Sequence, residues 1–175
     1  MKKIEQFQET EDKLIHAYEK LLVQQSKISV DMICEEANLH HQTFYRHFKN
    51  KEDFFVYCIT KKINNFIEEN NHLELKGVCI QLLEHCYPQA NLYRAYLKCP
   101  KSRQIISTKL THYFADKTRS DYGITDRKQI FFIIGGILFY IIQCITHSEA
   151  IDIKGAELSL EDIFDKIQIS FKPKQ

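Results

Sequence analysis

Apolar residues recur at intervals of three and four along most of the chain, which is the spacing of one face of an α-helix. No stretch shows a convincing period of two, so we predict an all-α protein of about nine helices. The expected helices cover residues 10–24, 30–37, 41–48, 49–69, 75–86, 89–99, 102–120, 126–147 and 160–171.

Local signals predict where several of these helices begin and end. Ser29 precedes an apolar-periodic stretch and is a good N-cap, and Asn38 can adopt the left-handed conformation that ends a helix. The sequence Ser159-Leu-Glu-Asp162 resembles a capping box, which would open the last helix. These signals place a short interruption at residues 38–40, between the second and third helices.

The composition limits the class of protein. Hydrophobic residues make up 44% of the chain and charged residues 27%, which predicts a globular protein, and only 5 Gly and 3 Pro argue against an all-β fold. The apolar run 130–142 is short for a bilayer span, so we expect a buried core helix and no membrane partner. The N-terminus lacks the apolar region of a secretory signal, which favours a cytoplasmic protein. The six cysteines show no paired spacing, so we expect free thiols, no metal and no cofactor.

The net charge is only +1, so a signal for nucleic acid must be local. Residues 40–51 provide one, because they carry three histidines, one arginine and two lysines without a carboxylate. Phe44 and Phe48 form the inward stripe of this third helix, and hydrogen-bond donors cover the rest of it. A short turn followed by a donor-rich helix is the pattern of a helix-turn-helix, whose recognition helix lies between walls of phosphate.

The segment ISVDMICEEANLHHQTFYRHFKNKEDFF resembles the DNA-binding signature of the TetR-type (tetracycline-repressor-like) transcriptional regulators. The most specific part is Thr43-Phe44-Tyr45-x-His47-Phe48 followed by Lys51-Glu52, and the resemblance covers about residues 10–60. It implies phosphate contacts from Ser29, Thr43, Tyr45, His47 and Lys51, and base contacts from His41 and Gln42. Arg46 lies on the same donor-rich face, and we expect it to bind the DNA backbone.

The sequence departs from the family pattern at three positions. Family members usually carry Gly at the position of Asn38, Ser at His40 and a small residue at Gln42. His40 is a poorer N-cap than Ser, and Gln42 can bond an adenine in bidentate fashion, so the operator should differ from those of well-known relatives.

The resemblance also implies a division of the chain. Residues 1–50 would form the helix-turn-helix domain, 51–70 a connecting helix, and 71–175 a helical domain for ligand binding and dimerisation. Aromatic residues are candidates for the wall of an effector pocket: Tyr93, Tyr96, Tyr113, Phe132 and Tyr140. A four-helix dimer interface would involve Gly135, Gly136, Phe139, Ile163, Phe164 and Ile167.

Two functions follow from these observations. The first is a homodimeric repressor that a small molecule releases from a pseudo-palindromic operator in double-stranded DNA. Here repression, as opposed to activation, rests on the resemblance alone. The second is a helix-turn-helix interaction module or coactivator without a small-molecule effector, and a cavity in the C-terminal domain would separate the two. An enzyme is disfavoured, because the chain shows no Ser/His/Asp order, no Gly-rich phosphate loop and no paired carboxylates.

Overall fold

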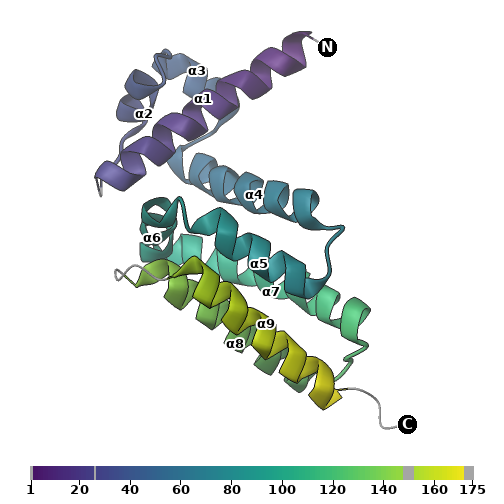
Figure 1. The fold of residues 1–175 in the computed structure, drawn as a ribbon. Helices are drawn as coiled ribbons and strands as arrows, with labels where there is room; N and C mark the ends of the chain where they lie inside the picture. The colour runs from purple at the N-terminus through teal and green to yellow at the C-terminus, as the bar shows by residue number, and fades with distance from the viewer. Residues whose placement is uncertain (1, 26, 148–151, 172–175) are drawn as a thin grey trace.

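The structure is a computed structural model that describes residues 2–25, 27–147 and 152–171. Within these residues it contains nine α-helices and no strand, which confirms the all-α prediction. The N-terminal helices lie at one end of the molecule, α4 crosses beneath them, and the remaining helices form a bundle at the other end (Figure 1). The start of α1 and the end of α9 therefore lie at opposite ends of the fold.

Three helices make up the N-terminal part: α1 (Lys2–Gln24), α2 (Val30–Glu36) and α3 (His41–His47). Their shared core is aromatic, because Phe44 from α3 meets Phe54 of α4 (Lys51–Asn70) at 5.2 Å between ring centroids, and Tyr18 of α1 meets Phe54 at 5.5 Å. Phe44 and Phe54 are fully buried and Phe48 is nearly so. The inward stripe predicted for the third helix is therefore confirmed.

The ends of α2 follow the sequence signals. The Ser29 hydroxyl accepts a hydrogen bond from the Met32 N–H at 3.2 Å, which satisfies a donor that the helix itself leaves unpaired. Asn38 has φ of 53°, the left-handed conformation predicted for it, and the N–H of Leu39 then bonds the Cys34 carbonyl at 2.8 Å. Together these bonds fix the turn that orients α3 relative to α2.

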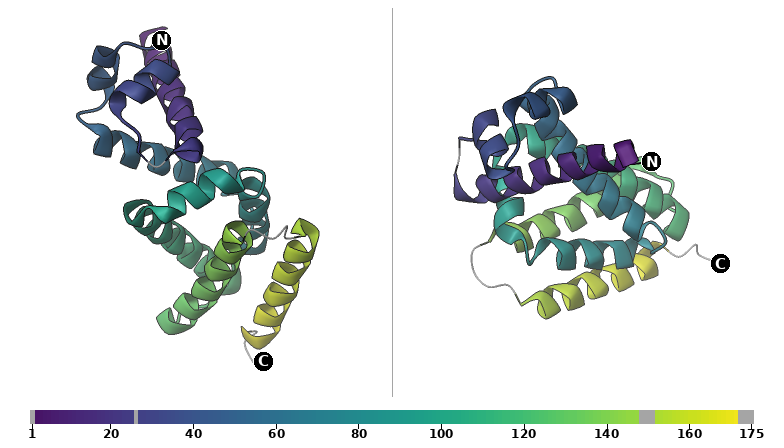
Figure 2. Two further views of the ribbon diagram at one scale, coloured as in Figure 1. Left: turned by 90° about the vertical axis from the view of Figure 1, so that its left-hand side faces the viewer. Right: turned by 90° about the horizontal axis from the view of Figure 1, so that it is seen from above.

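The C-terminal bundle consists of five helices: α5 (Leu75–Cys86), α6 (Ala90–Lys98), α7 (Pro100–Tyr122), α8 (Arg127–Thr146) and α9 (Ile153–Phe171). α4 packs on α7, α5 packs on α9, and α6 lies against α1, α7 and α8. Figure 2 shows α8 and α9 at the end of the molecule away from α2 and α3. Through α6 the bundle contacts α1, the long helix of the N-terminal part.

Two side chains form hydrogen bonds with the unpaired backbone groups at the ends of neighbouring bundle helices. The Asp121 carboxylate accepts a hydrogen bond from the Leu75 N–H at 2.8 Å, so a residue of α7 supplies the cap of α5. The Arg94 guanidinium donates to the carbonyls of Ile145 and His147 at 2.8 and 2.7 Å. A cation at the C-terminal end of α8 is favourable because unpaired carbonyls gather there.

Two predicted helix starts are wrong. α1 begins at Lys2, well before residue 10, and its additional turns pack over α3 through Phe7. α9 begins at Ile153, so Ser159 lies inside the helix and its hydroxyl bonds the Gly155 carbonyl at 2.8 Å. A Ser-x-x-Asp sequence stabilises a helix start only where the backbone before it leaves the helix, and here it does not.

Candidate nucleic-acid interface and internal cavity

The outer surface of α3 carries side chains that donate hydrogen bonds. His41, Gln42, Tyr45 and Arg46 are exposed, and Thr43 is half-buried beside them. The side chains of Gln42 and Arg46 form no hydrogen bond or ion pair with any described residue, so both are available to an external partner. Such a surface is suited to phosphate oxygens and base edges, which accept hydrogen bonds.

His41 is held by the helix before it. Its Nε2 lies 3.1 Å from the Asp31 carboxylate at the start of α2, and its ring meets that of Tyr45 edge-on at 4.9 Å between centroids. Ser29 is exposed two residues before Asp31, so the N-terminus of α2 and the start of α3 share one surface. The His40 side chain forms no cap bond, in agreement with its poor capping ability.

Lys51 also contributes to this part of the fold. Its Nζ donates to the Ile28 carbonyl at 3.0 Å, which ties the first turn of α4 to the segment between α1 and α2. An ammonium has three donors, so this bond leaves others for a phosphate. The contacts of Ser29, Thr43, Tyr45 and Lys51 with phosphate therefore stay predictions.

The structure does not support the phosphate contact predicted for His47. Its side chain is only 6% exposed, its ring stacks on Phe7, and Nδ1 lies 3.7 Å from the Glu11 carboxylate. Glu11 is itself nearly buried and accepts a hydrogen bond from the Tyr57 hydroxyl. The imidazole is therefore enclosed by α1, and the prediction failed because α1 is longer than its apolar stripe indicated.

The outer face of α8 is apolar and open. Phe131, Phe132 and Phe139 are 48, 85 and 64% exposed, and Gly135 and Gly136 are exposed between them. A Cβ added at either glycine would meet no atom within 4 Å, so the subunit itself does not require small residues there. The helix was predicted to be buried, but only its inner face is.

α8 is long and apolar enough to cross a membrane by length and composition alone, and 44% of its most apolar window is buried inside the subunit. α8 has 20 residues, whereas the sequence argument against a membrane span considered only the 13-residue apolar run 130–142. The inner face packs into the core through Ile130, Ile134, Ile137 and Ile141, as expected of a helix within a packed bundle. Core packing, and not length, is therefore the observation that distinguishes α8 from a membrane span.

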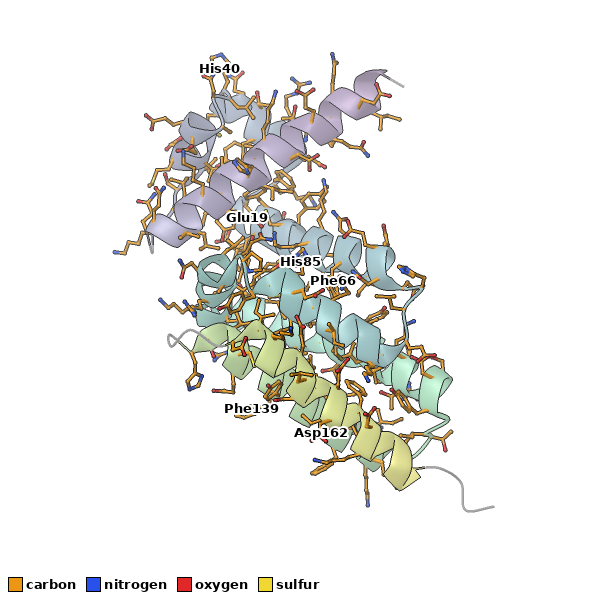
Figure 3. The ribbon with its side chains drawn as sticks, in the orientation of Figure 1. Glu19, His40, Phe66, His85, Phe139 and Asp162 are labelled. Atoms are coloured by element: carbon orange, nitrogen blue, oxygen red, sulfur yellow. The ribbon has the colours of Figure 1, made fainter. Side chains whose placement is uncertain are left out.

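The residues of α9 predicted at the dimer interface are divided between two environments. Phe164 is 1% exposed and its ring stacks near that of Tyr122, so it belongs to the subunit core and the prediction is wrong. Ile163 and Ile167 are half-buried, and Leu158 is 59% exposed. Figure 3 shows Phe139 of α8 and Asp162 of α9 in the part of the bundle away from the N-terminal helices.

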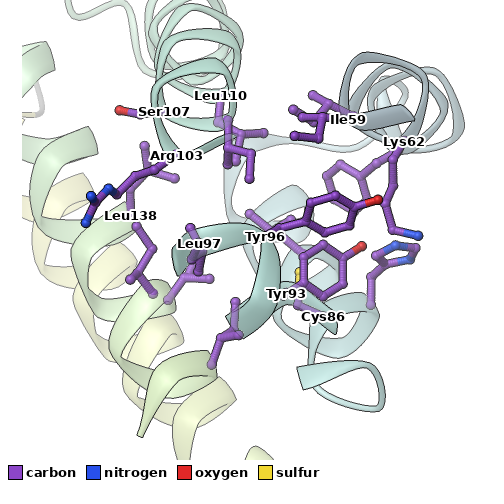
Figure 4. A pocket seen from close by; sticks show the side chains of 18 residues that line it. Ile59, Lys62, Cys86, Tyr93, Tyr96, Leu97, Arg103, Ser107, Leu110 and Leu138 are labelled. Carbon is purple, nitrogen blue, oxygen red and sulfur yellow. The ribbon is translucent and has the colours of Figure 1, made fainter. Parts of the chain in front are cut away.

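A cavity of about 280 Å³ lies in the bundle, between α4, α5, α6, α7 and α8. Its wall is mostly apolar and includes Ile59, Ile63, Phe66, Ile106, Leu110 and Ile141. Lys62, Tyr93 and Tyr96 lie at one end, and Arg103, Ser107 and Leu138 lie at the other (Figure 4). Arg103 and Ser107 are exposed, so their end is the mouth.

Two of the five predicted pocket residues, Tyr93 and Tyr96, line this cavity. Phe132 does not, because it points outward on α8 and is 85% exposed. Tyr113 and Tyr140 do not line it either, and the Tyr140 hydroxyl instead donates to the Ala156 carbonyl at 3.4 Å. These three predictions are wrong, because an aromatic residue on an apolar helix face can pack equally well in a core or an interface.

Three polar residues of the cavity wall were not predicted from the sequence. Lys62, His85 and Arg103 each line it, although each is a polar position within a helical stripe. Spacing offers one usable signal, because Lys62 is adjacent to Ile63 and four residues before Phe66, which places it at the border of a buried face. A long side chain at such a border can bury its stem and direct its ammonium inward.

Comparisons with known proteins agree with this geometry. Residues 25–58 match the family model described as bacterial regulatory proteins, tetR family. A transcriptional regulator of the TerR/AcrR family from Aquifex aeolicus VF5 superposes with a TM-score of 0.70 at 22% identity, covering 90% of this chain and 99% of that one. A TetR transcriptional regulator from Streptococcus agalactiae 2603V gives 0.68 at 19% identity and covers 99% of each chain.

A third structure, the dihydroxyacetone kinase operon activator DhaS, has a TM-score of 0.66 at 18% identity and covers 93% of this chain and 96% of its own. No curated protein matches the chain. The matched segment spans α2, α3 and the first turns of α4, and the structural likeness extends over nearly the whole chain. Residues 25–58 are therefore similar to the segment that the tetR family model describes, and the chain has the all-α fold of these solved regulators.

Proposed function

We propose that this protein is a TetR-type regulator, a homodimeric repressor that binds a pseudo-palindromic operator in the cytoplasm and leaves it when a small molecule fills the cavity. The observation that carries the proposal is the surface of α3, where exposed donors occur without a carboxylate in the helix. Gln42 would read a base edge near the N-terminus of the recognition helix, and Arg46 would hold a phosphate. This function requires no catalytic group.

The open face of α8 supports the homodimer. One helix-turn-helix reads one half-site, so a second copy is needed for an operator of useful specificity. Exposed apolar side chains along one face of a helix mark an interaction surface, and Gly135 and Gly136 would let the partner helix approach closely. We infer that α8 and the adjacent surface of α9 pair with their own copies across a two-fold axis.

The cavity supports the effector. The coactivator alternative, in which the chain has no small-molecule ligand, gives no reason for an apolar cavity with an open mouth. A ligand in this cavity would contact α4 and α6, and these helices connect the bundle to the N-terminal part. Binding can then shift the positions of the two recognition helices, provided that the ligand prefers one arrangement over the other.

Selection of binding sites from random double-stranded DNA tests the function. We expect a pseudo-palindrome whose half-sites lie about one DNA turn apart, about 34–36 Å. Gln42→Ala should weaken the preference at one base pair per half-site, by about 1–3 kcal/mol. Arg46→Ala should weaken binding to all sequences and reduce the salt slope by about one unit per subunit.

Lys98→Ala provides the matched control, because Lys98 is an exposed cation of α6 and lies outside the proposed surface. It should leave both the selected sequence and the salt slope unchanged. Failure to select any sequence, or a Lys98→Ala effect equal to that of Arg46→Ala, would contradict DNA recognition by α3.

A further inference from the structure

The inner end of the cavity is joined to α1 by a shared carboxylate. Glu19 of α1 lies 3.0 Å from the Lys62 ammonium and accepts a hydrogen bond from the Tyr96 hydroxyl at 3.1 Å, both on Oε1. Lys62 and Tyr96 line the cavity, whereas Glu19 does not. Two groups of the cavity wall therefore hold a residue of the N-terminal part, and Figure 3 shows Glu19 between that part and the bundle.

His85 adds an unused hydrogen-bonding group to the same end. Its Nε2 is buried and has no hydrogen-bond partner among the described residues, although buried polar atoms are nearly always paired. The ring lies 6.0 Å from that of Tyr93, over which the Lys62 ammonium sits at 5.7 Å. An unpaired buried nitrogen in the wall of a cavity is a candidate contact for a ligand.

The charges of the cavity wall have one sign. Lys62 and Arg103 are cationic, and among the described residues no aspartate or glutamate lines the cavity. Burial, and then the Glu19 carboxylate, raise the pKa of Tyr96, so its hydroxyl stays protonated and can donate. A cationic ligand would meet no described carboxylate in the wall, whereas an anion would meet an ammonium and a hydroxyl at the inner end and apolar side chains along its length.

We propose that the cavity binds an apolar monocarboxylate whose head group replaces Glu19 on Lys62 and Tyr96 and accepts a hydrogen bond from His85. This inference rests on the proposed function, because it names the class of the effector and its route to α1. A cavity of 150 Å³ holds benzene, so by proportion 280 Å³ holds roughly ten to twelve non-hydrogen atoms. Straight-chain acids of eight to ten carbons have this size.

Replacement follows from charge balance. Glu19 and Lys62 are an ion pair whose side chains are only 17 and 23% exposed. A second carboxylate at this ammonium would place two negative charges around one positive charge in a poorly solvated site, which is unfavourable. Glu19 would turn toward solvent, and α1 would lose the contacts that Glu19 makes with Lys62 of α4 and Tyr96 of α6. The coupling is reciprocal: a change that weakens the contact of Glu19 with Lys62 must also raise the affinity for the acid. Coupled sites typically change each other's affinity by about 5–150-fold.

Calorimetry with octanoate and its neutral counterpart 1-octanol tests the inference on the whole chain without DNA. The wild type should bind octanoate at least tenfold more tightly than 1-octanol. Lys62→Met should remove this preference and keep 1-octanol binding. Glu19→Gln should increase octanoate affinity about tenfold, because the competing charge is gone, and should leave 1-octanol affinity unchanged.

Arg103→Gln is the matched control, since Arg103 is the cation at the mouth and has no partner among the described residues. It should leave the acid preference intact. Loss of the preference in Arg103→Gln but not in Lys62→Met would place the head group at the mouth and overturn the inference. Equal wild-type affinity for acid and alcohol, or binding of neither, would also overturn it, and Glu19→Gln decides the matter if Lys62→Met does not fold.

The two proposals can fail separately. If site selection yields no operator but octanoate binds as described, the assignment as a repressor fails and the ligand class stands. If an operator is found and octanoate does not bind, the ligand class fails and the assignment as a repressor stands. If both proposals hold, octanoate should release the wild type from the selected operator, whereas Lys62→Met should stay bound at the same octanoate concentration.

Discussion

The imidazole of His47 in α3 stacks on the ring of Phe7 in α1, with centroids 3.8 Å apart and planes inclined by 26°. The contact joins residues forty positions apart and encloses the imidazole next to Glu11. It also explains why α1 extends beyond its apolar stripe, because these first turns gain their stability from packing on α3. The first turns of α1 thus belong to the structure of the helix-turn-helix.

Phe7→Ala should lower the free energy of unfolding by about 1–2 kcal/mol. Complete burial of a Phe is worth about 3–5 kcal/mol, and Phe7 is 47% exposed, so roughly half of this is expected. Urea denaturation followed by circular dichroism measures the change. Ile4→Ala on the same helix, where Ile4 is 67% exposed, should change stability by less than about 0.5 kcal/mol. Equal effects of the two substitutions would show that the Phe7 contact contributes nothing specific.

Gly136→Leu should break or weaken the dimer without harming the subunit. A Cβ at Gly136 meets nothing within 4 Å, and removing a glycine from a helix interior stabilises the helix by up to about 1 kcal/mol. A weaker dimer would then show that the leucine side chain clashes with the partner subunit. Light scattering and sedimentation measure the mass. Asn65→Leu, an exposed position of α4, adds the same side chain elsewhere and should keep the wild-type mass; an unchanged Gly136→Leu dimer would exclude Gly136 from the interface.

Cys99 should be the reactive thiol among the six cysteines. Burial raises the pKa of Cys99, but hydrogen bonds from Ser102 and Lys101 at the start of α7 outweigh it, so the pKa lies below its ordinary value. The other five thiols are buried, and burial raises the pKa of Cys86, for example, to about 12. Mass spectrometry after brief exposure to iodoacetamide at neutral pH should show one modification. Cys99→Ser should abolish it and Cys34→Ser should not, while modification spread over several cysteines would contradict the ranking.

His85 should make the protein less stable as the pH falls. Burial, and then the ammonium of Lys62, lower the pKa of His85, and the carboxylates of Glu69 and Glu19 oppose this only in part. Below about pH 6.5 His85 binds a proton in the unfolded chain but not in the folded protein. The free energy of unfolding therefore decreases as the pH falls from about 6.5 to the folded pKa of His85. Above that pH both states are neutral and His85 contributes no slope.

Thermal unfolding between pH 5 and 8 at constant ionic strength measures this dependence. His85→Gln cannot titrate and should lose less stability between pH 7 and pH 5 than the wild type. His72→Gln, at an exposed position, should follow the wild type. A steeper decrease for His85→Gln than for the wild type would show that the folded state favours the charged imidazole.

The sequence by itself determined the features that depend on neighbouring residues. The cap at Ser29, the left-handed Asn38 and the spacing of Phe44 and Phe48 on one helix face each depend on residues within about four positions. The number of helices follows for the same reason, since the period of an apolar stripe is a local property. The family resemblance in residues 25–58 lies in this same locally determined segment.

The tertiary structure decided which partner covers each apolar face. A stripe shows that a face is apolar, but it does not show whether a core, a cavity or another subunit lies against it. Phe164 therefore proved to be core and Phe132 proved to be exposed, although their sequence patterns are alike. His47 turned inward because Phe7, forty residues earlier, packs on it, and Lys62 entered the cavity wall because Glu19 of α1 holds its ammonium. These contacts join distant segments, and their geometry exists only once the helices have packed.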